Sequence, residues 1–265
     1  MNIYLSCDIE GTAGIVDWDE TDLDQPLADY YKQQMTNEVN AACIGANNAN
    51  AKEILVKDAH GSARTLTPSA LPQNVKLLRG WTRNPHIMMA GIDSNNFDAS
   101  VFVGYHSGSS QNGNPLAHTM HCNYDYVKIN NRVVTEFMMN AYTSIYYNIP
   151  VAFISGDKMV CEDAKELFPN IVTVAVSEGL GQASISIHPE LATQRITDGV
   201  KEALSGDLSR HMIKLPDNFD IEIKFRQHHM AYRASFYPGV TQLNPQTIQF
   251  STNDYYEFLR LFLFI

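Results

Sequence analysis

Residues 4–11 read Tyr4-Leu5-Ser6-Cys7-Asp8-Ile9-Glu10-Gly11, a short apolar run that ends in two carboxylates and a glycine. The apolar run predicts a buried β-strand. Because side chains alternate along an extended chain, Asp8 and Glu10 point to the same side. In open α/β sheets, ligands lie in the crevice beyond the carboxyl ends of the strands. Two anions there repel each other unless a cation or a shared proton lies between them. On these residues alone, half of a metal site and a pair of solvated loop carboxylates remain equally open.

The segments that follow alternate between helix and strand. Apolar residues on one face predict a helix over residues 27–48, and residues 53–57 read as a second buried strand. A strand, a helix and a strand in succession predict a right-handed βαβ unit. Further strands are predicted at 75–79, 97–105, 149–155 and 171–176, and helices at 135–147, 160–168 and 189–204. We therefore expect an α/β fold with a mostly parallel central sheet flanked by helices.

The pattern changes towards the end of the chain. Residues 221–225 alternate between apolar and polar, which is typical of a half-exposed strand. A helix at 231–235, a strand at 247–250 and a helix at 254–264 follow. These elements predict a small C-terminal α+β annex of the form βαβα over residues 213–265, packed on a catalytic α/β domain of residues 1–212 that carries the metal site. A β-hairpin is predicted earlier, at 124–134, around Asn130-Asn131.

Three predicted strands are followed by residues of the types that commonly serve as metal ligands. Asp8 and Glu10 follow the first strand, His60 follows the second, and His106 follows the strand at 97–105. In a parallel sheet these ends face one crevice. Mixed carboxylates and imidazoles suit zinc, manganese or iron rather than calcium, and such a set can hold two ions about 3.5–4 Å apart. Asp58 is a candidate to orient His60 rather than to bind metal itself. One histidine at a strand end is usually structural, but two beside a carboxylate pair seldom coincide by chance.

Two further segments add candidate site residues. Residues 107–115 are rich in Ser, Gly and Asn, which predicts a flexible loop of the kind that often surrounds active sites, and the loop leads to His118. Thr135 is a candidate cap for the helix that follows. Glu136 would then lie in the first helical turn, where the helix dipole favours a carboxylate.

The composition narrows the classes of partner. The 265 residues carry a net charge of −10 with no basic stripe, which argues against a nucleic-acid partner and against an anionic membrane surface. The apolar segment 258–265 is interrupted by Arg260 and is too short to span a bilayer. The N-terminus has no charged region typical of a signal peptide. The four cysteines are widely spaced and form no C-x-x-C pair, so we expect reduced thiols in a cytoplasmic protein.

Several motifs, in order along nearly the whole chain, resemble those of the D-aminopeptidase family of binuclear zinc peptidases. They are residues 6–11, Asp58-Ala59-His60, Gly104-Tyr105-His106, Ala117-His118-Thr119-Met120, Thr135-Glu136 with Asn140-Ala141-Tyr142, Gly156-Asp157 and residues 247–250. Each motif alone is weak, whereas their common order and spacing are specific.

The resemblance implies a site and a reaction. It implies two Zn²⁺ per chain, one held by Asp8, Glu10 and His60 and the other by His106 and Glu136, with Asp8 bridging and His118 catalytic. It further implies a zinc-dependent D-aminopeptidase that removes an N-terminal D-amino acid from short peptides, D-alanyl-D-alanine among them, by means of a metal-activated water. The family assembles as a closed, ring-based homodecamer, so we also expect a homo-oligomer. The preference for D-amino acids rests on the resemblance alone.

The departures from the family pattern are modest: Cys7, Ala59 and Ala117 replace other small residues, and Lys158 replaces an acidic one. One rival enzyme class shares part of the pattern. Lys158 stands where the family has an acidic residue after Gly-Asp, which predicts altered specificity if that acid binds the substrate amine. The motif Asp8-Ile9-Glu10-Gly11-Thr12 is similar to the D-x-D-G-T of haloacid-dehalogenase-type magnesium phosphatases, in which Asp8 would be the nucleophile. Glu10 is one methylene too long for that reaction, and the three histidines would have no role.

A non-enzymatic alternative is a metal-stabilised scaffold or binding protein. Such a site would be closed by protein ligands, whereas the loop at 107–115 indicates an open one. We therefore expect an enzyme.

Overall fold

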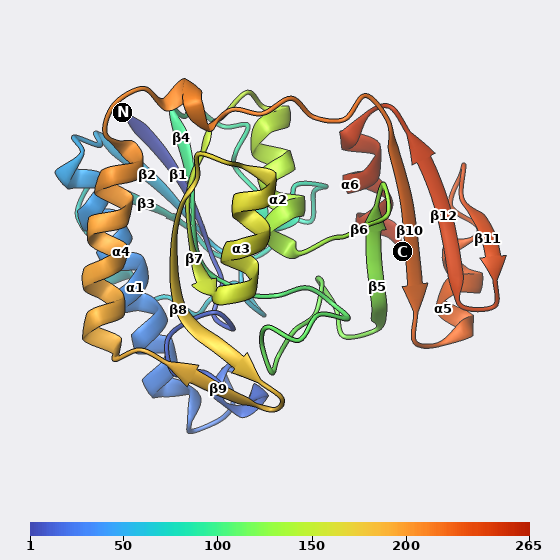
Figure 1. Cartoon of the computed structure of the whole chain (residues 1–265), viewed down its shortest axis with the longest axis horizontal. Helices are drawn as coiled ribbons and strands as arrows, with labels where there is room; N and C mark the ends of the chain where they lie inside the picture. Colours follow the sequence, from blue (N-terminus) through green and yellow to red (C-terminus); the bar gives the residue numbers. More distant parts are fainter.

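The central sheet of the computed structural model, which describes residues 1–265, has seven strands in the order β3-β2-β1-β4-β7-β8-β9 (Figure 1). Their bounds are β1 Asn2–Cys7, β2 Glu53–Asp58, β3 Val75–Leu78, β4 Ala99–Tyr105, β7 Val151–Asp157, β8 Val172–Leu180 and β9 Ala183–Ser186. All neighbours pair in parallel except β8 and β9, which are antiparallel. The predicted α/β fold with a mostly parallel sheet is confirmed.

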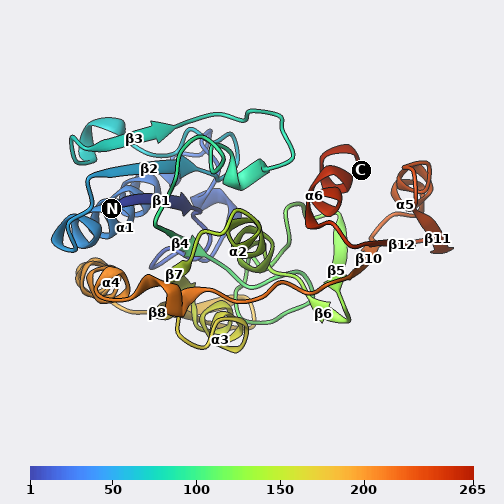
Figure 2. The same ribbon diagram turned by 90° about the horizontal axis from the view of Figure 1, so that it is seen from above.

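Helices cover both faces of this sheet. α1 (Ala28–Asn48) and α4 (Pro189–Leu204) lie on one face, and α2 (Glu136–Tyr146) and α3 (Lys158–Leu167) lie on the other (Figures 1 and 2). Short 3₁₀ turns join the elements, namely η1 Trp18–Glu20, η2 Pro68–Ala70, η3 Ile87–Met89 and η4 Leu208–His211. No helix combines the length and the apolar character that crossing a bilayer requires.

A second, antiparallel sheet has the strand order β11-β12-β10-β5-β6. Its strands are β5 Tyr124–Ile129, β6 Arg132–Val133, β10 Phe219–Phe225, β11 Thr241–Asn244 and β12 Thr247–Thr252. α5 (His228–Ala234) and α6 (Tyr255–Phe264) lie on one face of this sheet (Figure 2). The predicted hairpin, β5 and β6, therefore belongs to the same sheet as the C-terminal strands. The sequence analysis did not predict β11.

The two sheets share a hydrophobic core. One continuous cluster of buried side chains includes Phe137 of α2 and Ile154 of β7 together with Ile223 of β10 and Phe258 of α6. The Tyr255 hydroxyl of α6 also donates a hydrogen bond to a main-chain oxygen of α2 (2.7 Å). The boundary between residues 212 and 213 stays a prediction.

The β8–β9 hairpin is longer than the sequence pattern indicates. The predicted strand ends at residue 176, but β8 continues to Leu180 and turns through Gly181, whose φ is +62°. The hairpin was missed because its residues are polar or exposed, so they lack the apolar run that marks a buried strand. β9 forms the edge of the sheet.

Candidate metal centre

The carboxyl ends of β1, β2 and β4 meet at one edge of the central sheet, as expected for parallel neighbours. The turn after β1 packs directly on β4, because the Gly11 amide donates a hydrogen bond to the Gly104 carbonyl (2.9 Å). A Cβ atom on Gly11 would lie 1.8 Å from the Tyr105 carbonyl oxygen. Only glycine permits this approach, and it places Asp8 and Glu10 against the end of β4.

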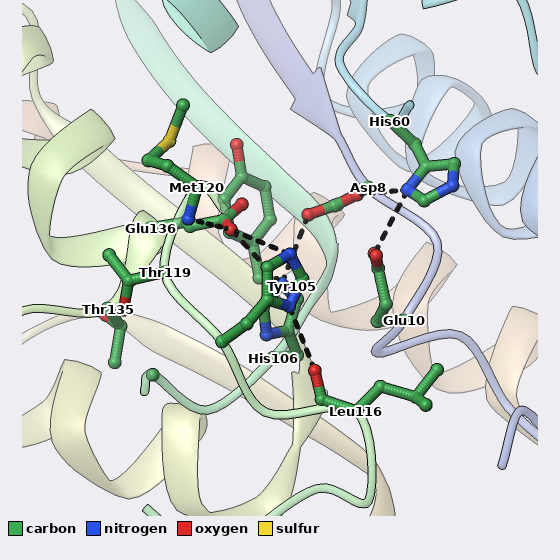
Figure 3. A network of polar contacts seen from close by, with 12 residues as sticks. Asp8, Glu10, His60, Tyr105, His106, Leu116, Thr119, Met120, Thr135 and Glu136 are labelled. Atoms are coloured by element: carbon green, nitrogen blue, oxygen red, sulfur yellow. Dashed lines mark hydrogen bonds and ion pairs between the residues drawn. The ribbon is translucent and has the colours of Figure 1, made fainter. Parts of the chain in front are cut away.

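Asp8 lies between two histidines (Figure 3). His60 Nδ1 is 3.2 Å from both Asp8 Oδ1 and Glu10 Oε2. On the other side, His106 Nε2 is 3.5 Å from Asp8 Oδ2 and 3.6 Å from Glu136 Oε1. The two oxygens of one carboxylate thus belong to two adjoining clusters of potential ligand atoms.

The structure brings all six predicted site residues together. Three groups have ligand atoms within 4.8 Å of one another, and they are Asp8–Glu10–His60, Asp8–His106–Glu136 and Glu10–His106–His118. His118 Nε2 lies 3.4 Å from Glu136 Oε1.

Main-chain carbonyl groups orient the three imidazole rings. The contacts are His60 Nε2 to Thr21 O (3.1 Å), His106 Nδ1 to Ser107 O (2.8 Å) and His118 Nδ1 to Leu116 O (2.9 Å). A carbonyl oxygen can only accept, so each of these nitrogens carries a hydrogen. In the neutral rings the other nitrogen therefore presents a lone pair to the carboxylates. This is the arrangement that metal-binding histidines adopt, with the remote nitrogen donating to a fixed partner.

The three carboxylates of the centre are buried, and burial makes their charged forms costly in free energy unless positive charge lies nearby. Asp8, Glu10 and Glu136 are each at most 3% exposed. Burial, together with the nearby charge of Glu10, raises the pKa of Asp8 to about 6. Burial also opposes ionisation of Glu136, yet His106 and His118 outweigh it and lower the pKa of Glu136 to about 2. The neighbouring histidines therefore outweigh burial at Glu136, whereas at Asp8 burial and the charge of Glu10 prevail.

The carboxylates in turn raise the pKa values of the neighbouring histidines. Burial alone would lower the pKa of His60, but Glu10 and Asp8 raise it well above its ordinary value. Burial likewise disfavours charge on His106, and Glu136 and Asp8 again raise its pKa well above 6.5. Protons or metal ions must therefore balance the buried carboxylates.

The residues fit a bound metal ion. Glu10 Oε2 and His106 Nε2 are buried and have no hydrogen-bond partner. His60 Nδ1 is close to Glu10 Oε2 but is not aligned for a hydrogen bond. Leaving buried polar atoms unpaired costs free energy, and a cation between them would remove that cost. Carboxylate oxygens and imidazole nitrogens are ligands that zinc accepts.

The start of α2 fixes Glu136. Thr135 caps the helix, and its side chain accepts a hydrogen bond from the Met138 amide (3.0 Å). The Met120 amide donates to Glu136 Oε1 (2.7 Å), which orients the carboxylate towards His106 and His118. The predicted cap is thus present, and the helix dipole further stabilises the Glu136 anion.

The loop at 107–115 is tied down, so the prediction of a flexible loop is wrong. The Ser107 amide and hydroxyl donate to Asp157 (2.6 and 2.7 Å), and the Asn114 side chain donates to the Glu10 carbonyl (3.0 Å). Gln111 donates to Asp163 of α3 (2.6 Å). The polar residues that suggested mobility instead hold the loop against the site.

Two other candidates have roles away from the centre. Asp58 accepts a hydrogen bond from the Leu66 amide (2.8 Å) and forms none with His60, whose ring is oriented by Thr21 instead. Lys158 pairs with Glu178 on the surface (2.9 Å) and does not line the cavity above the metal centre.

A cavity of about 600 Å³ opens above the cluster. Its floor contains Asp8, Glu10, His60, His118 and Glu136. Its walls are largely apolar and include Trp18, Trp81, Met88, Met120, Tyr124 and Phe262. The Trp18 ring meets the His118 ring edge-on, with centroids 5.2 Å apart. Trp81, Met88 and their neighbours come from an irregular segment without a periodic signal, so the sequence pattern did not identify them as cavity residues.

A cavity whose floor joins buried carboxylates and imidazoles at the strand ends of an α/β sheet is typical of a metal-dependent hydrolase. Residues 1–264 match the model of peptidase family M55, the D-aminopeptidases, and the chain belongs to that family. It is therefore a peptidase, and the phosphatase alternative is not supported.

Two relatives agree with this assignment. The D-aminopeptidase of Bacillus subtilis (strain 168) is 30% identical over 261 residues, which cover 97% of this chain and 93% of that protein. A solved structure of the zinc-dependent D-aminopeptidase DppA from Bacillus subtilis, a self-compartmentalizing protease, matches with a TM-score of 0.91 and 29% identity. That match covers 99% of this chain and 96% of the other. The resemblance inferred from the motifs is confirmed.

Proposed function

We propose that this chain is a binuclear zinc aminopeptidase that removes an N-terminal D-amino acid, of the D-alanine type, from short peptides. The observation that carries this proposal is the pair of carboxylate–imidazole clusters that share Asp8. Membership of the D-aminopeptidase family supplies the preference for D-residues.

The ligand assignment follows the two clusters. Asp8, Glu10 and His60 would hold one zinc ion, and His106 and Glu136 would hold the other, with Asp8 bridging. The support is that Oδ1 of Asp8 faces His60 while Oδ2 faces His106. When bound, two zinc ions polarise the scissile carbonyl and lower the pKa of a water molecule towards neutrality.

His118 would transfer protons during hydrolysis. Its Nδ1–H is held by the Leu116 carbonyl, so Nε2 is the nitrogen available for a proton. Glu136 Oε1 lies 3.4 Å from that atom and would stabilise the charged ring. His118 lines the cavity floor, where it could accept a proton from the attacking water and return it to the leaving amine. His118 also belongs to the third cluster of potential ligand atoms, with Glu10 and His106, so binding a metal ion is the alternative role for this residue.

The substrate would lie with its free amine towards the acidic floor and its side chains against the apolar walls. A homo-oligomer, with ten chains as the expected number, is supported by the self-compartmentalizing relative. Exposed apolar side chains such as Leu180, Ile185 and Phe236 are available for contacts between subunits. The four cysteines are free thiols, which fits a reducing cytoplasm.

Metal analysis combined with a substrate pair tests the proposal. Purified protein should contain two zinc ions per chain, and Asp8→Asn should lower that content because an amide bridges two cations poorly. D-alanyl-D-alanine should be cleaved much faster than L-alanyl-L-alanine. The exposed Asp93→Asn is a matched control that should keep both ions. One ion per chain at saturation, or faster cleavage of the L-peptide, would contradict the proposal.

A further inference from the structure

We propose that Arg83 binds the C-terminal carboxylate of the substrate, so that the enzyme selects very short peptides with a free C-terminus, dipeptides foremost. This inference rests on the proposed aminopeptidase function and specifies its substrate class. Arg83 lies outside the six residues assigned to metal binding and proton transfer.

The charges around the cavity favour such a contact. Arg83 is the only lysine or arginine among the residues that line the cavity, and it is exposed at the rim. Arg83 forms no ion pair with a carboxylate of the protein, because the ion pairs of lysines and arginines all involve other residues. The same cavity is lined by the carboxylates Asp8, Glu10 and Glu136 of the proposed metal centre. A zwitterionic peptide matches this distribution when its amine faces the floor and its carboxylate faces Arg83.

The backbone around Arg83 is held in an unusual conformation. Arg83 has a φ of +61°, and Ile87 has a φ of +51° although it is β-branched. The left-handed region is rare for residues other than glycine and especially for β-branched ones. Such conformations persist only where the surrounding structure enforces them, and they concentrate at ligand-binding sites. Ile87 also lines the cavity, so both strained residues belong to this wall.

Specific contacts anchor this wall beside the metal centre. The buried Lys57 donates a hydrogen bond to the Gly80 carbonyl (2.9 Å), and its ammonium lies 4.5 Å from the centre of the Trp81 ring. Trp81 Nε1 in turn donates to the Gly61 carbonyl (2.8 Å), next to the proposed ligand His60. The rim that carries Arg83 is therefore fixed relative to the floor rather than being a loose surface loop.

The size of the cavity agrees with a short substrate. A sphere of 600 Å³ is about 10 Å across, and each extended residue spans at most about 3.3–3.6 Å. The space thus accommodates about two or three residues between floor and rim. In a longer peptide the group that reaches the rim is a neutral amide, which forms a weaker contact with a guanidinium than a carboxylate does.

The test compares D-alanyl-D-alanine with its C-terminal amide, which keeps the scissile bond and removes the negative charge. Wild-type enzyme should prefer the acid over the amide by about 10- to 100-fold in kcat/KM, the range expected for a charge-assisted contact. Arg83→Gln should bring that ratio close to 1, mainly by raising KM for the acid. Arg83→Lys should retain an intermediate ratio, because the charge remains but the paired donors are lost.

Arg79→Gln is the matched control, since Arg79 is an exposed arginine that does not line the cavity, and it should keep the wild-type ratio. Zinc content and gel filtration of each variant check that the fold is intact. Equal cleavage of acid and amide by the wild type, or an unchanged ratio in Arg83→Gln, would overturn the inference while leaving the aminopeptidase function in place. If the wild type cleaves only L-dipeptides, the same pair is compared in the L-series. If it cleaves no peptide, the proposed function fails and this inference fails with it.

Discussion

The imidazole rings of His106 and His118 lie stacked, with their centroids 4.4 Å apart and their planes 9° from parallel. Both Nδ1 atoms point to main-chain carbonyls, and both Nε2 atoms approach the same oxygen of Glu136, at 3.6 and 3.4 Å. The two rings differ in exposure, because the His106 side chain is fully buried while that of His118 is 14% exposed on the cavity side. This difference supports the proposed roles of His106 as a ligand and of His118 as the proton carrier.

Replacing His118 separates catalysis from metal binding. We expect His118→Gln to lower kcat by about 10²- to 10⁴-fold, the usual contribution of general acid–base catalysis, while two zinc ions per chain remain. Steady-state kinetics and elemental analysis of the same preparation measure both quantities. His228→Gln, on the exposed surface of α5, is the control and should behave like wild type. Loss of one ion in His118→Gln would show instead that this residue is a ligand.

Capping of α2 should affect zinc affinity as well as stability. Thr135→Ala removes the cap from the helix that begins with Glu136, and its cost should be about 1 kcal/mol of unfolding free energy. Asp254→Ala removes the comparable cap of α6, which carries no proposed ligand. Both variants should lose similar stability in denaturant unfolding, but only Thr135→Ala should bind zinc more weakly in competition with a chelator. Equal zinc affinities would mean that the cap does not position Glu136.

Glu38 of α1 predicts a pH dependence of stability that is independent of the metal centre. The side chain is completely buried, accepts hydrogen bonds from the Ala13 amide and the Gln34 side chain, and has one oxygen without a partner. Burial raises its pKa from 4.5 to about 7. Between these values the folded state holds a proton that the unfolded state has released, so stability falls as the pH rises from about 4.5 to 7. The full penalty is of order 3 kcal/mol above pH 7.

Glu38→Gln should remove this penalty, because the amide oxygen can still accept from Ala13. The variant should match wild type at pH 4.5–5 and exceed it in unfolding midpoint at pH 8. Thermal unfolding at both pH values, at equal protein and zinc concentrations, gives the comparison. A difference that does not change with pH would contradict the buried-proton explanation.

Chelation should destabilise the protein more strongly at higher pH. Without metal, charged His60 and His106 balance the carboxylates, and their pKa values are raised above 6.5. The stability from these raised values is fully present below pH 6.5 and is lost as the pH rises through the folded-state values. Zinc binding itself strengthens with pH because protons compete less. The gap in unfolding midpoint between zinc-loaded and chelated protein should therefore widen from pH 6 to pH 9, and a constant gap would oppose this account.

Asp8, Glu10, His60 and His106 could be proposed as ligands from the sequence because each follows a strand whose apolar run is visible, whereas Glu136, at the start of α2, was proposed as a ligand only through the family resemblance. Parallel pairing of β1, β2 and β4 then brings Asp8, His60 and His106 to one edge without further information. The orientation of the rings could not be predicted, since it depends on carbonyl groups that every residue possesses. The order within the loop at 107–115 was also hidden, because Ser107 bonds to Asp157, fifty positions later in the chain.

Arg83 illustrates a second limit of sequence patterns. Arg83 has a left-handed backbone conformation although it is neither glycine nor asparagine, and the contacts that anchor its wall come from Lys57 and Gly61, more than twenty positions earlier. The hairpin β5–β6 was predicted correctly as a local element. Its partner strand β10 lies about ninety residues further on, beyond the range of any local pattern.

That pairing of β5 with β10 imposes an order on biosynthesis. Every proposed metal ligand has been translated once Glu136 is complete, whereas β10 begins only at Phe219 and the cavity-lining residues Phe262, Leu263 and Ile265 are translated later still. A nascent chain can therefore assemble the ligand cluster while β5 still presents an unpaired edge, which is the kind of surface that invites pairing with other chains. The segment from β10 to the C-terminus closes that edge and completes the cavity, so the growing chain contains all of its proposed metal ligands before its cavity has a full set of walls.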